Sequence, residues 1–272
     1  MLLDIVPSKV EAALREVAAE HVTPLFGNLD VGDVRSKSGP LDMVTAADVA
    51  AEAALTPFLL DLVPGSKVIG EEAASEDPSI VDALLGDGVF WTVDPVDGTR
   101  NFVAGREEFG SMVALIENGE TVMGWIYFPM SGGCATAVKG EGAFFKDVRL
   151  KAGSDRAPGA LIGDYSARLV EDANKDVLDA NAPQLGAVTD IGCAARQYAD
   201  LASGALDYVV WGKIYPWDHA PGALLFEEAG GRTAYIEGGA PYAPKPVKHK
   251  PMLSAPRDAW DEVHAHLLRP VA

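Results

Sequence analysis

The stretch FWTVDPVDGTRNF, residues 90–102, joins an apolar run to two aspartates, a glycine and a threonine. The apolar run predicts a buried strand, and Asp94 and Asp97 follow at its end. Such carboxylates must be paired, protonated or bound to a metal, because burying an unpaired charge is costly. Hard oxygen ligands select Mg²⁺, Mn²⁺ or Ca²⁺. The residues alone leave a simpler alternative open, in which Asp97 ends the strand in an Asx turn and caps a helix.

Composition limits the classes of protein to which the chain can belong. Its 272 residues are 48% hydrophobic and 23% charged, which is typical of a globular protein with a large core. The net charge of −18 disfavours nucleic-acid and membrane partners, because phosphate groups would be repelled. No apolar stretch approaches the roughly 20 residues that span a bilayer, and no secretory signal is recognisable. Cys134 and Cys193 do not make a disulfide framework, so we expect a cytoplasmic protein.

Helical patterns begin and end at recognisable residues in the first part of the chain. A capping box that starts at Ser8 predicts a first helix, which runs to Gly27. Thr45 is predicted to cap a second helix, which ends at the Pro-Gly pair at 64–65. The segment 36–42, rich in small and turn-forming residues, is predicted to be a loop between them.

Strand patterns divide the chain into two predicted lobes. Asn118-Gly119 predicts a tight β-hairpin, and residues 133–145 add further antiparallel strand. We therefore expect a first lobe over 1–150, with helices on a mainly antiparallel sheet. From about residue 155 strands and helices alternate, which predicts an α/β lobe over 151–272.

Further acidic residues stand at the ends of predicted elements. Glu71 and Glu72 end the strand KVIGEE, where neighbouring carboxylates repel one another unless a cation intervenes, although a solvated turn is the alternative. Asp218 opens a helix, and a simple N-cap would account for it. Thr45 and Asp48 fit a capping arrangement that also needs no further function.

Four of these segments together resemble the inositol monophosphatase family. They are KSGPLDMVTAAD (37–48), GEE (70–72), DPVDGTRNF (94–102) and WDHAPGALLFEEAGG (217–231), in the family's order. The resemblance implies a layered αβαβα sandwich of the mixed α/β class, usually a homodimer, with the site between the lobes. It also implies hydrolysis of a small phosphate monoester by metal-activated water, without a phosphoenzyme.

The resemblance implies a metal-binding role for each matching acidic position. Glu71, Asp94 and the carbonyl of Val96 would hold a first Mg²⁺. Asp94, Asp97 and Asp218 would hold a second, and Glu71 would help to place a third, weaker ion. The resemblance also implies that Mn²⁺ could replace Mg²⁺ and that Li⁺ and Ca²⁺ would inhibit.

The same resemblance assigns residues to the phosphate and the attacking water. Gly98 and Thr99 would bind the phosphate through their amides, with Asp97 beside it. Thr99, hydrogen-bonded to Asp48, would orient the water, with Glu71 as the other catalytic group. Ala194 would meet the substrate through its backbone, and Lys37 would lie near the open site.

The identity of the substrate is left open by Trp211, seven positions before Asp218. Inositol-cleaving members of the family carry an acidic residue at this position. Trp211 either stacks on a ring of the substrate or is a core residue. An inositol phosphate or a related alcohol or sugar phosphate is the expected substrate. Histidinol phosphate and 3′(2′),5′-bisphosphate nucleotides are alternatives. A regulatory binding protein that retains the fold is an alternative of another class, and a structural calcium module is a third.

Overall fold

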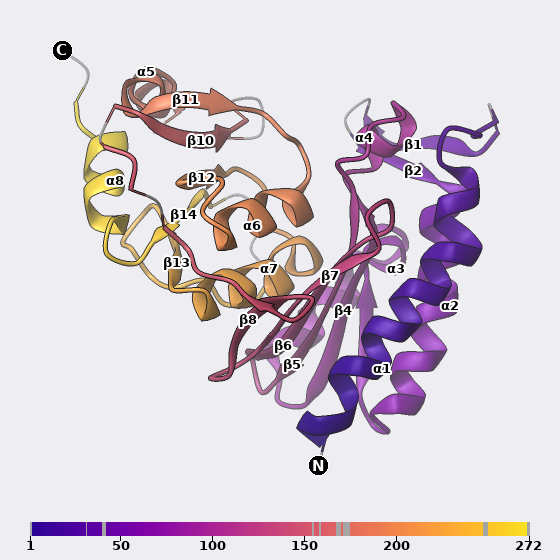
Figure 1. The fold of residues 1–272 in the computed structure, drawn as a ribbon. Coiled ribbons are helices and arrows are strands. Elements are labelled where there is room, and N and C mark those ends of the chain that lie inside the picture. Colours follow the sequence, from indigo (N-terminus) through magenta and orange to yellow (C-terminus); the bar gives the residue numbers. More distant parts are fainter. Residues whose placement is uncertain are drawn as a thin grey trace.

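The structure is a computed structural model that describes residues 2–30, 32–39, 42–153, 155–157, 159–166, 170, 175–246 and 250–270. Helices and sheets alternate in five layers (Figure 1). Helices α1 and α2 cover one face of a seven-stranded sheet, α6 and α7 lie between it and a five-stranded sheet, and α5 and α8 cover the far face of the second sheet. This is the αβαβα sandwich that the family resemblance implied.

The first helix begins earlier than its capping box predicted. Helix α1 spans Leu2–Val17, so Ser8 lies inside it, and a π turn and a 3₁₀ turn continue to Leu25. The reason is that Val6 and Val10, one turn apart, are both buried, so the apolar stripe extends past Pro7 toward the N-terminus. Helix α2 spans Ala46–Leu62 and is capped by Thr45, as predicted.

The segment predicted to be a loop before α2 is a short hairpin instead. Strand β1 (Val34–Gly39) pairs antiparallel with β2 (Asp42–Thr45), and Val34 lies opposite Thr45. The small residues of 36–42 favour a turn, but β1 continues to Gly39 and β2 begins at Asp42, so the turn is shorter than the predicted loop. Lys37 therefore belongs to β1, and its side chain lies outside the described residues.

The large sheet has the order β3-β4-β5-β6-β7-β8-β9, and only the β3–β4 pairing is parallel. Asn118 and Gly119 both have positive φ and join β5 to β6 by the predicted two-residue turn. The strands are β3 (Lys67–Gly70), β4 (Val89–Asp97), β5 (Gly110–Glu117), β6 (Glu120–Phe128), β7 (Gly133–Val138), β8 (Gly142–Phe145) and β9 (Val148–Arg149). Short helices α3 (Glu71–Glu76) and α4 (Thr99–Val103) follow β3 and β4.

The second sheet has the order β11-β10-β12-β14-β13 and mixes parallel with antiparallel pairs. Its strands are β10 (Leu161–Tyr165), β11 (Gly186–Thr189), β12 (Tyr208–Trp211), β13 (Gly231–Tyr235) and β14 (Met252–Pro256). The helices are α5 (Lys175–Leu185), α6 (Ala194–Ala202), α7 (Pro216–Glu228) and α8 (Trp260–Leu267). The division into lobes at residue 150 stays a prediction.

Helix α7 packs tightly against the middle of the large sheet. A Cβ at Gly124 of β6 would lie 2.8 Å from the Pro221 carbonyl oxygen, so only glycine allows this approach. A Cβ at Gly222 would similarly overlap the ring of Tyr198 on α6. These two glycines let α7 lie close to the large sheet and to α6, and α7 also contacts β4.

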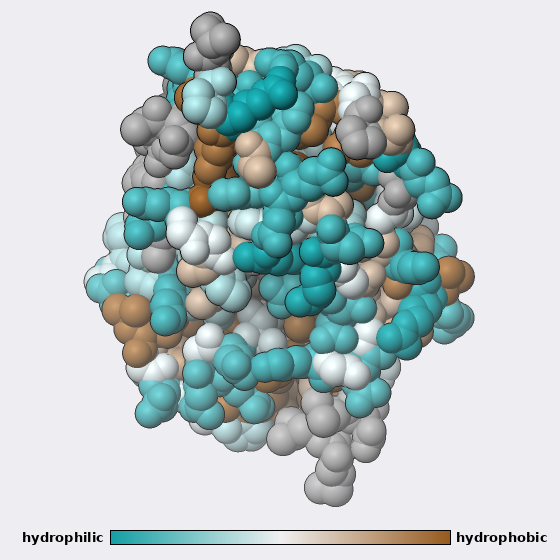
Figure 2. Space-filling model, turned by 90° about the vertical axis from the view of Figure 1, so that its left-hand side faces the viewer, coloured by the Kyte–Doolittle hydropathy of each residue, from teal (hydrophilic) through white to brown (hydrophobic). Residues whose placement is uncertain are grey.

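The outer surface is largely polar where α5 and α8 face outward. On this face hydrophilic residues predominate and hydrophobic ones form small separate groups (Figure 2). Among the described residues, none of the helices combines the length and the apolar character needed to cross a membrane.

Candidate active site

A β-bulge turns both aspartates of the opening motif toward the same side. Asp94 pairs with Met112 of β5 and Asp97 pairs with Gly110, so three steps along β4 match two along β5. Residues three apart in a regular strand face opposite sides of the sheet, but one extra residue reverses this. Pro95 lies within the bulge, and its carbonyl accepts a hydrogen bond from the Ser111 hydroxyl (2.7 Å).

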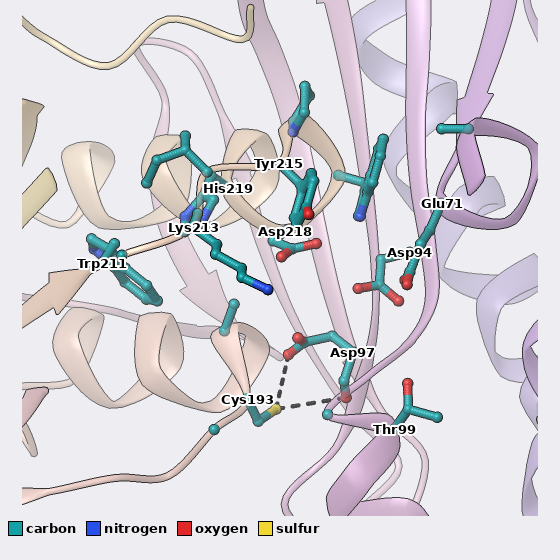
Figure 3. A pocket seen from close by; sticks show the side chains of 18 of the residues that line it. Glu71, Asp94, Asp97, Thr99, Cys193, Trp211, Lys213, Tyr215, Asp218 and His219 are labelled. Carbon is teal, nitrogen blue, oxygen red and sulfur yellow. Dashed lines mark hydrogen bonds between the residues drawn. The ribbon is translucent and has the colours of Figure 1, made fainter. Parts of the chain in front are cut away.

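Four acidic side chains line one cavity of about 410 Å³. Figure 3 shows the carboxylates of Glu71, Asp94, Asp97 and Asp218 pointing into it. Glu71 begins α3, the two aspartates end β4, and Asp218 lies in the first turn of α7. Three elements that are distant in sequence therefore bring these carboxylates to one place.

The Asp94 carboxyl is buried among the other three. Its side chain is 2% exposed. Burial raises its pKa well above the usual value, and the nearby carboxylates of Glu71, Asp97 and Asp218 raise it further. A group in this position is ionised at neutral pH only if positive charge lies close to it.

Two hydrogen bonds from the start of α6 hold the Asp97 carboxylate. Its Oδ2 accepts from the thiol of Cys193 (2.9 Å) and from the backbone N–H of Ala195 (2.6 Å). Burial raises the pKa of Asp97, and these hydrogen bonds partly oppose the shift. The sequence had shown Cys193 only as an isolated cysteine, because nothing in its neighbourhood along the chain connects it with β4.

A buried carboxylate on α2 fixes the start of α3. Glu52 accepts hydrogen bonds from the backbone N–H groups of Glu72 (2.8 Å) and Ala73 (2.9 Å). A Cβ at Gly70 would lie 2.2 Å from Glu52 Cδ, so glycine leaves the space that this carboxyl needs. Glu52 thereby sets the backbone from which Glu71 reaches the cavity. The sequence analysis missed it, although an acid on the apolar stripe of α2 was visible.

Asp48 faces Thr99, which lines the cavity, in the predicted pairing. Asp48 is 1% exposed, and its Oδ2 accepts from the N–H of Thr45 (2.8 Å) in a capping box. Its Oδ1 lies 3.4 Å from Thr99 Oγ1, at the long end for a hydrogen bond. The shorter contact of Thr99 Oγ1 is to the carbonyl of Val96 (3.0 Å), an oxygen with a second lone pair.

Gly98 has a conformation and a neighbourhood that exclude a side chain. Its φ is +85°, and a Cβ there would lie 2.9 Å from the Glu108 carbonyl oxygen and 3.1 Å from Cys193 Cβ. Gly98 precedes α4, whose first N–H groups have no partner within the helix. Gly98 and Thr99 both line the cavity beside Asp97.

The donor set fits a hard divalent cation, but the side chains are not yet gathered around one. Carboxylates that raise one another's pKa in a buried cavity are stabilised by Mg²⁺ or Mn²⁺. Within the described part of the chain, no three His, Cys, Asp or Glu side chains already have an arrangement that could hold a metal ion. Asp94 Oδ1 accepts from the backbone N–H of Val96 (3.0 Å), and Asp97 Oδ2 is held by α6.

Trp211 lines the cavity, but most of its side chain is buried against other residues of the protein. Its indole N–H donates to Ser254 Oγ (2.8 Å), and its ring stacks on Tyr198 with 4.4 Å between centroids. His219 packs edge-on against the same indole. Ala194, the first residue of α6, lines the cavity as well and is 8% exposed.

Comparison with known proteins identifies relatives over almost the whole chain. Residues 7–271 match the model of the inositol monophosphatase family. The inositol-1-monophosphatase SuhB of Mycobacterium tuberculosis is 33% identical over 84% of each chain. A fructose-1,6-bisphosphatase/inositol-1-monophosphatase of Thermotoga maritima is 29% identical over 76% of this chain and 77% of that protein. The crystal structure of the extragenic suppressor protein SuhB from Bartonella henselae superposes with a TM-score of 0.79, at 26% identity and 99% coverage of both chains.

Proposed function

Because the chain belongs to the inositol monophosphatase family, and is therefore a phosphoric monoester hydrolase, we propose that it cleaves a small alcohol or sugar phosphate with the help of Mg²⁺. One observation supports this most strongly: four carboxylates from three elements point into one cavity, and Asp94 is buried among them. An inositol phosphate or a related monoester is the substrate class that we propose.

Glu71, Asp94, Asp97 and Asp218 would hold two or three Mg²⁺ ions, together with the carbonyl of Val96. When bound, Mg²⁺ lowers the pKa of a water molecule and neutralises charge on the phosphoryl oxygens and the departing alkoxide. Asp97 keeps its orientation through Cys193 and α6 while it does so.

Thr99 and Asp48 would position the attacking water. The Oδ2 atom of Asp48 is occupied by Thr45, so its Oδ1 atom is the one that faces Thr99. When the Thr99 hydroxyl donates toward Asp48 or Val96, its oxygen can accept a hydrogen bond from water. The backbone N–H groups of Gly98 and Thr99 would bind the phosphate oxygens.

Water is the proposed nucleophile, and the thiol and the imidazole that line the cavity both have hydrogen-bond partners. The Cys193 thiol donates to Asp97, and burial together with that carboxylate raises its pKa well above the usual value, so it stays protonated. Both ring nitrogens of His219 have partners, Tyr198 Oη (3.0 Å) and the Lys213 carbonyl (2.9 Å). Neither residue is available to form a phosphoenzyme or to act as a general base.

We further propose a cytoplasmic homodimer. Cys134 and Cys193 are both buried free thiols, which suits a reducing compartment. The dimer follows the resemblance alone, and sedimentation of the purified protein tests it.

A substrate panel tests the function. Purified protein with Mg²⁺ should release phosphate from at least one of inositol 1-phosphate, histidinol phosphate, a sugar phosphate and adenosine 3′,5′-bisphosphate, and EDTA should abolish the release. Histidinol phosphate or the bisphosphate as the preferred substrate would select one of those alternatives. No release from any compound would contradict the phosphatase and favour the regulatory binding protein.

A further inference from the structure

A lysine enters the acidic cavity from the segment before α7. Lys213 lies five residues before Asp218, and its side chain points into the cavity that Asp97 and Asp218 line (Figure 3). In the part of the chain that the structure describes, its ammonium group has no ion pair and no hydrogen bond. An ammonium that points into a cavity without a protein partner there can bind an anionic ligand.

The backbone of Lys213 is held from behind by two buried side chains. Its carbonyl oxygen lies 2.9 Å from His219 Nε2, and His219 Nδ1 lies 3.0 Å from the Tyr198 hydroxyl oxygen. A carbonyl only accepts, so Nε2 carries the proton and Nδ1 accepts from Tyr198. Both side chains are fully buried, and this chain of hydrogen bonds fixes the point from which the lysine extends.

A second polar group that lines the same cavity lacks a hydrogen-bond partner among the described residues. Ser166 lines the cavity and is 8% exposed, and its Oγ has no hydrogen-bond partner among the described residues. A buried hydroxyl without a partner is costly, whereas a ligand oxygen within the cavity would satisfy it. The cavity thus combines carboxylates, suited to cations, with a lysine and a hydroxyl, which are suited to an anion.

We propose that Lys213 determines which substrates the enzyme prefers, a proposal that rests on the phosphatase function above. The alcohol part of the preferred substrate carries a second anionic group, a carboxylate or another phosphate. The Lys213 ammonium binds this group, and Ser166 donates a hydrogen bond to the same part of the substrate.

The charge of Lys213 acts on a bound substrate more strongly than the net charge of the whole chain does. The chain carries −18 overall, which disfavours doubly anionic substrates at a distance. Within the cavity, however, a contact of a few ångströms is well inside the screening length of about 8 Å. A neutral polyol leaves the ammonium without a partner, whereas an anionic substituent pairs with it.

Matched substrate pairs test the proposal. Each pair differs in one charged group: glycerol 3-phosphate and 3-phosphoglycerate, and fructose 1-phosphate and fructose 1,6-bisphosphate. The first pair tests a carboxylate and the second tests a phosphate. The kcat/KM values with saturating Mg²⁺ are compared for wild type, Lys213→Met and Lys213→Arg. Lys139→Met removes an exposed charge that pairs with Glu120 and serves as the control.

Wild type should prefer the anionic member of at least one pair. Lys213→Met should lower kcat/KM for that member by about 10- to 100-fold, mainly through KM, because a charge-assisted hydrogen bond is lost. The neutral member should change less than twofold, and Lys213→Arg should keep most of the preference. Equal loss on both members, or no loss, would overturn the role of Lys213. No hydrolysis of any of the four compounds by wild type would instead contradict the phosphatase function itself.

Discussion

The thiol of Cys193 lies 2.9 Å from Asp97 Oδ2 and donates to it, so α6 positions a carboxylate that lies on β4. We predict that Cys193→Ala raises the Mg²⁺ concentration required for half-maximal phosphate release by about tenfold, the usual loss when the hydrogen-bond partner of a metal ligand is removed. Cys193→Ser keeps a donor and should stay within about threefold of wild type. Mg²⁺ titrations of both variants measure this, and an alanine variant that behaves as wild type would show that Asp97 needs no such support.

Glu52 supports the acidic cavity from the opposite side. We predict that Glu52→Ala lowers the free energy of unfolding by about 1–3 kcal/mol, because two backbone N–H groups at the start of α3 lose a buried acceptor. It should also weaken Mg²⁺ activation, since Glu71 begins the same helix. Urea unfolding and Mg²⁺ titration measure the two effects. Loss of stability with an unchanged Mg²⁺ requirement would mean that Glu71 is positioned by other contacts.

The buried carboxyl of Asp164 predicts that the stability of the fold depends on pH. It is fully buried on β10, and its carboxylate accepts from the Thr189 hydroxyl (2.8 Å), the Ile191 N–H (2.8 Å) and the Gln197 amide. Burial raises its pKa. A carboxyl whose folded pKa is raised stabilises the fold below its unfolded pKa of about 3.9, and this contribution is lost as pH rises through the folded value.

The isosteric variant Asp164→Asn isolates this effect. The difference in free energy of unfolding between wild type and Asp164→Asn should be largest near pH 4 and should shrink as pH rises toward 7. Urea unfolding at several pH values measures it. A difference that grows with pH would show that the ionised form is the one the fold stabilises.

Trp211 is predicted to act mainly in packing. Trp211→Phe removes the hydrogen bond to Ser254 and part of the buried ring, and should lower stability by about 1–3 kcal/mol. Ser254 keeps its hydrogen bond with Thr233 (2.8 Å). The ratio of kcat/KM between two substrates should change by less than about twofold, since a stacked ring is retained. A large change in that ratio would assign the indole to substrate recognition.

The sequence predicted those parts of the fold that depend on local signals. The Asn118-Gly119 turn was recognised because both residues favour positive φ, and the apolar run before Asp94 is the buried strand β4. The start of α1 was predicted wrongly for a local reason. The pattern at Ser8 marks a plausible helix start, yet the buried stripe extends to Val6.

The supporting residues of the site could not be predicted in the same way. Cys193 depends on a contact between packed layers, and no residue near it in sequence indicates a link to β4. Lys213 lies five residues before Asp218, but no pattern in the sequence indicates that its side chain points into the cavity. Glu52 is different, because it lies one turn after Asp48 on the buried face of α2. An acid on an apolar stripe must have a partner, so this residue carried a signal that periodicity alone would have revealed.

The central claim is that the buried carboxylates at the end of β4 bind Mg²⁺ and that hydrolysis depends on it. Isothermal titration of Mg²⁺ into wild type and Asp94→Asn, with phosphate release measured on the same samples, tests it most directly. Asp261→Asn, an exposed carboxylate paired with Arg232, is the matched control. Asp94→Asn should lose most of the Mg²⁺ binding heat and at least about 100-fold in kcat/KM while remaining folded, and the control should match wild type. An Asp94→Asn protein that binds Mg²⁺ and releases phosphate as wild type does would contradict the claim.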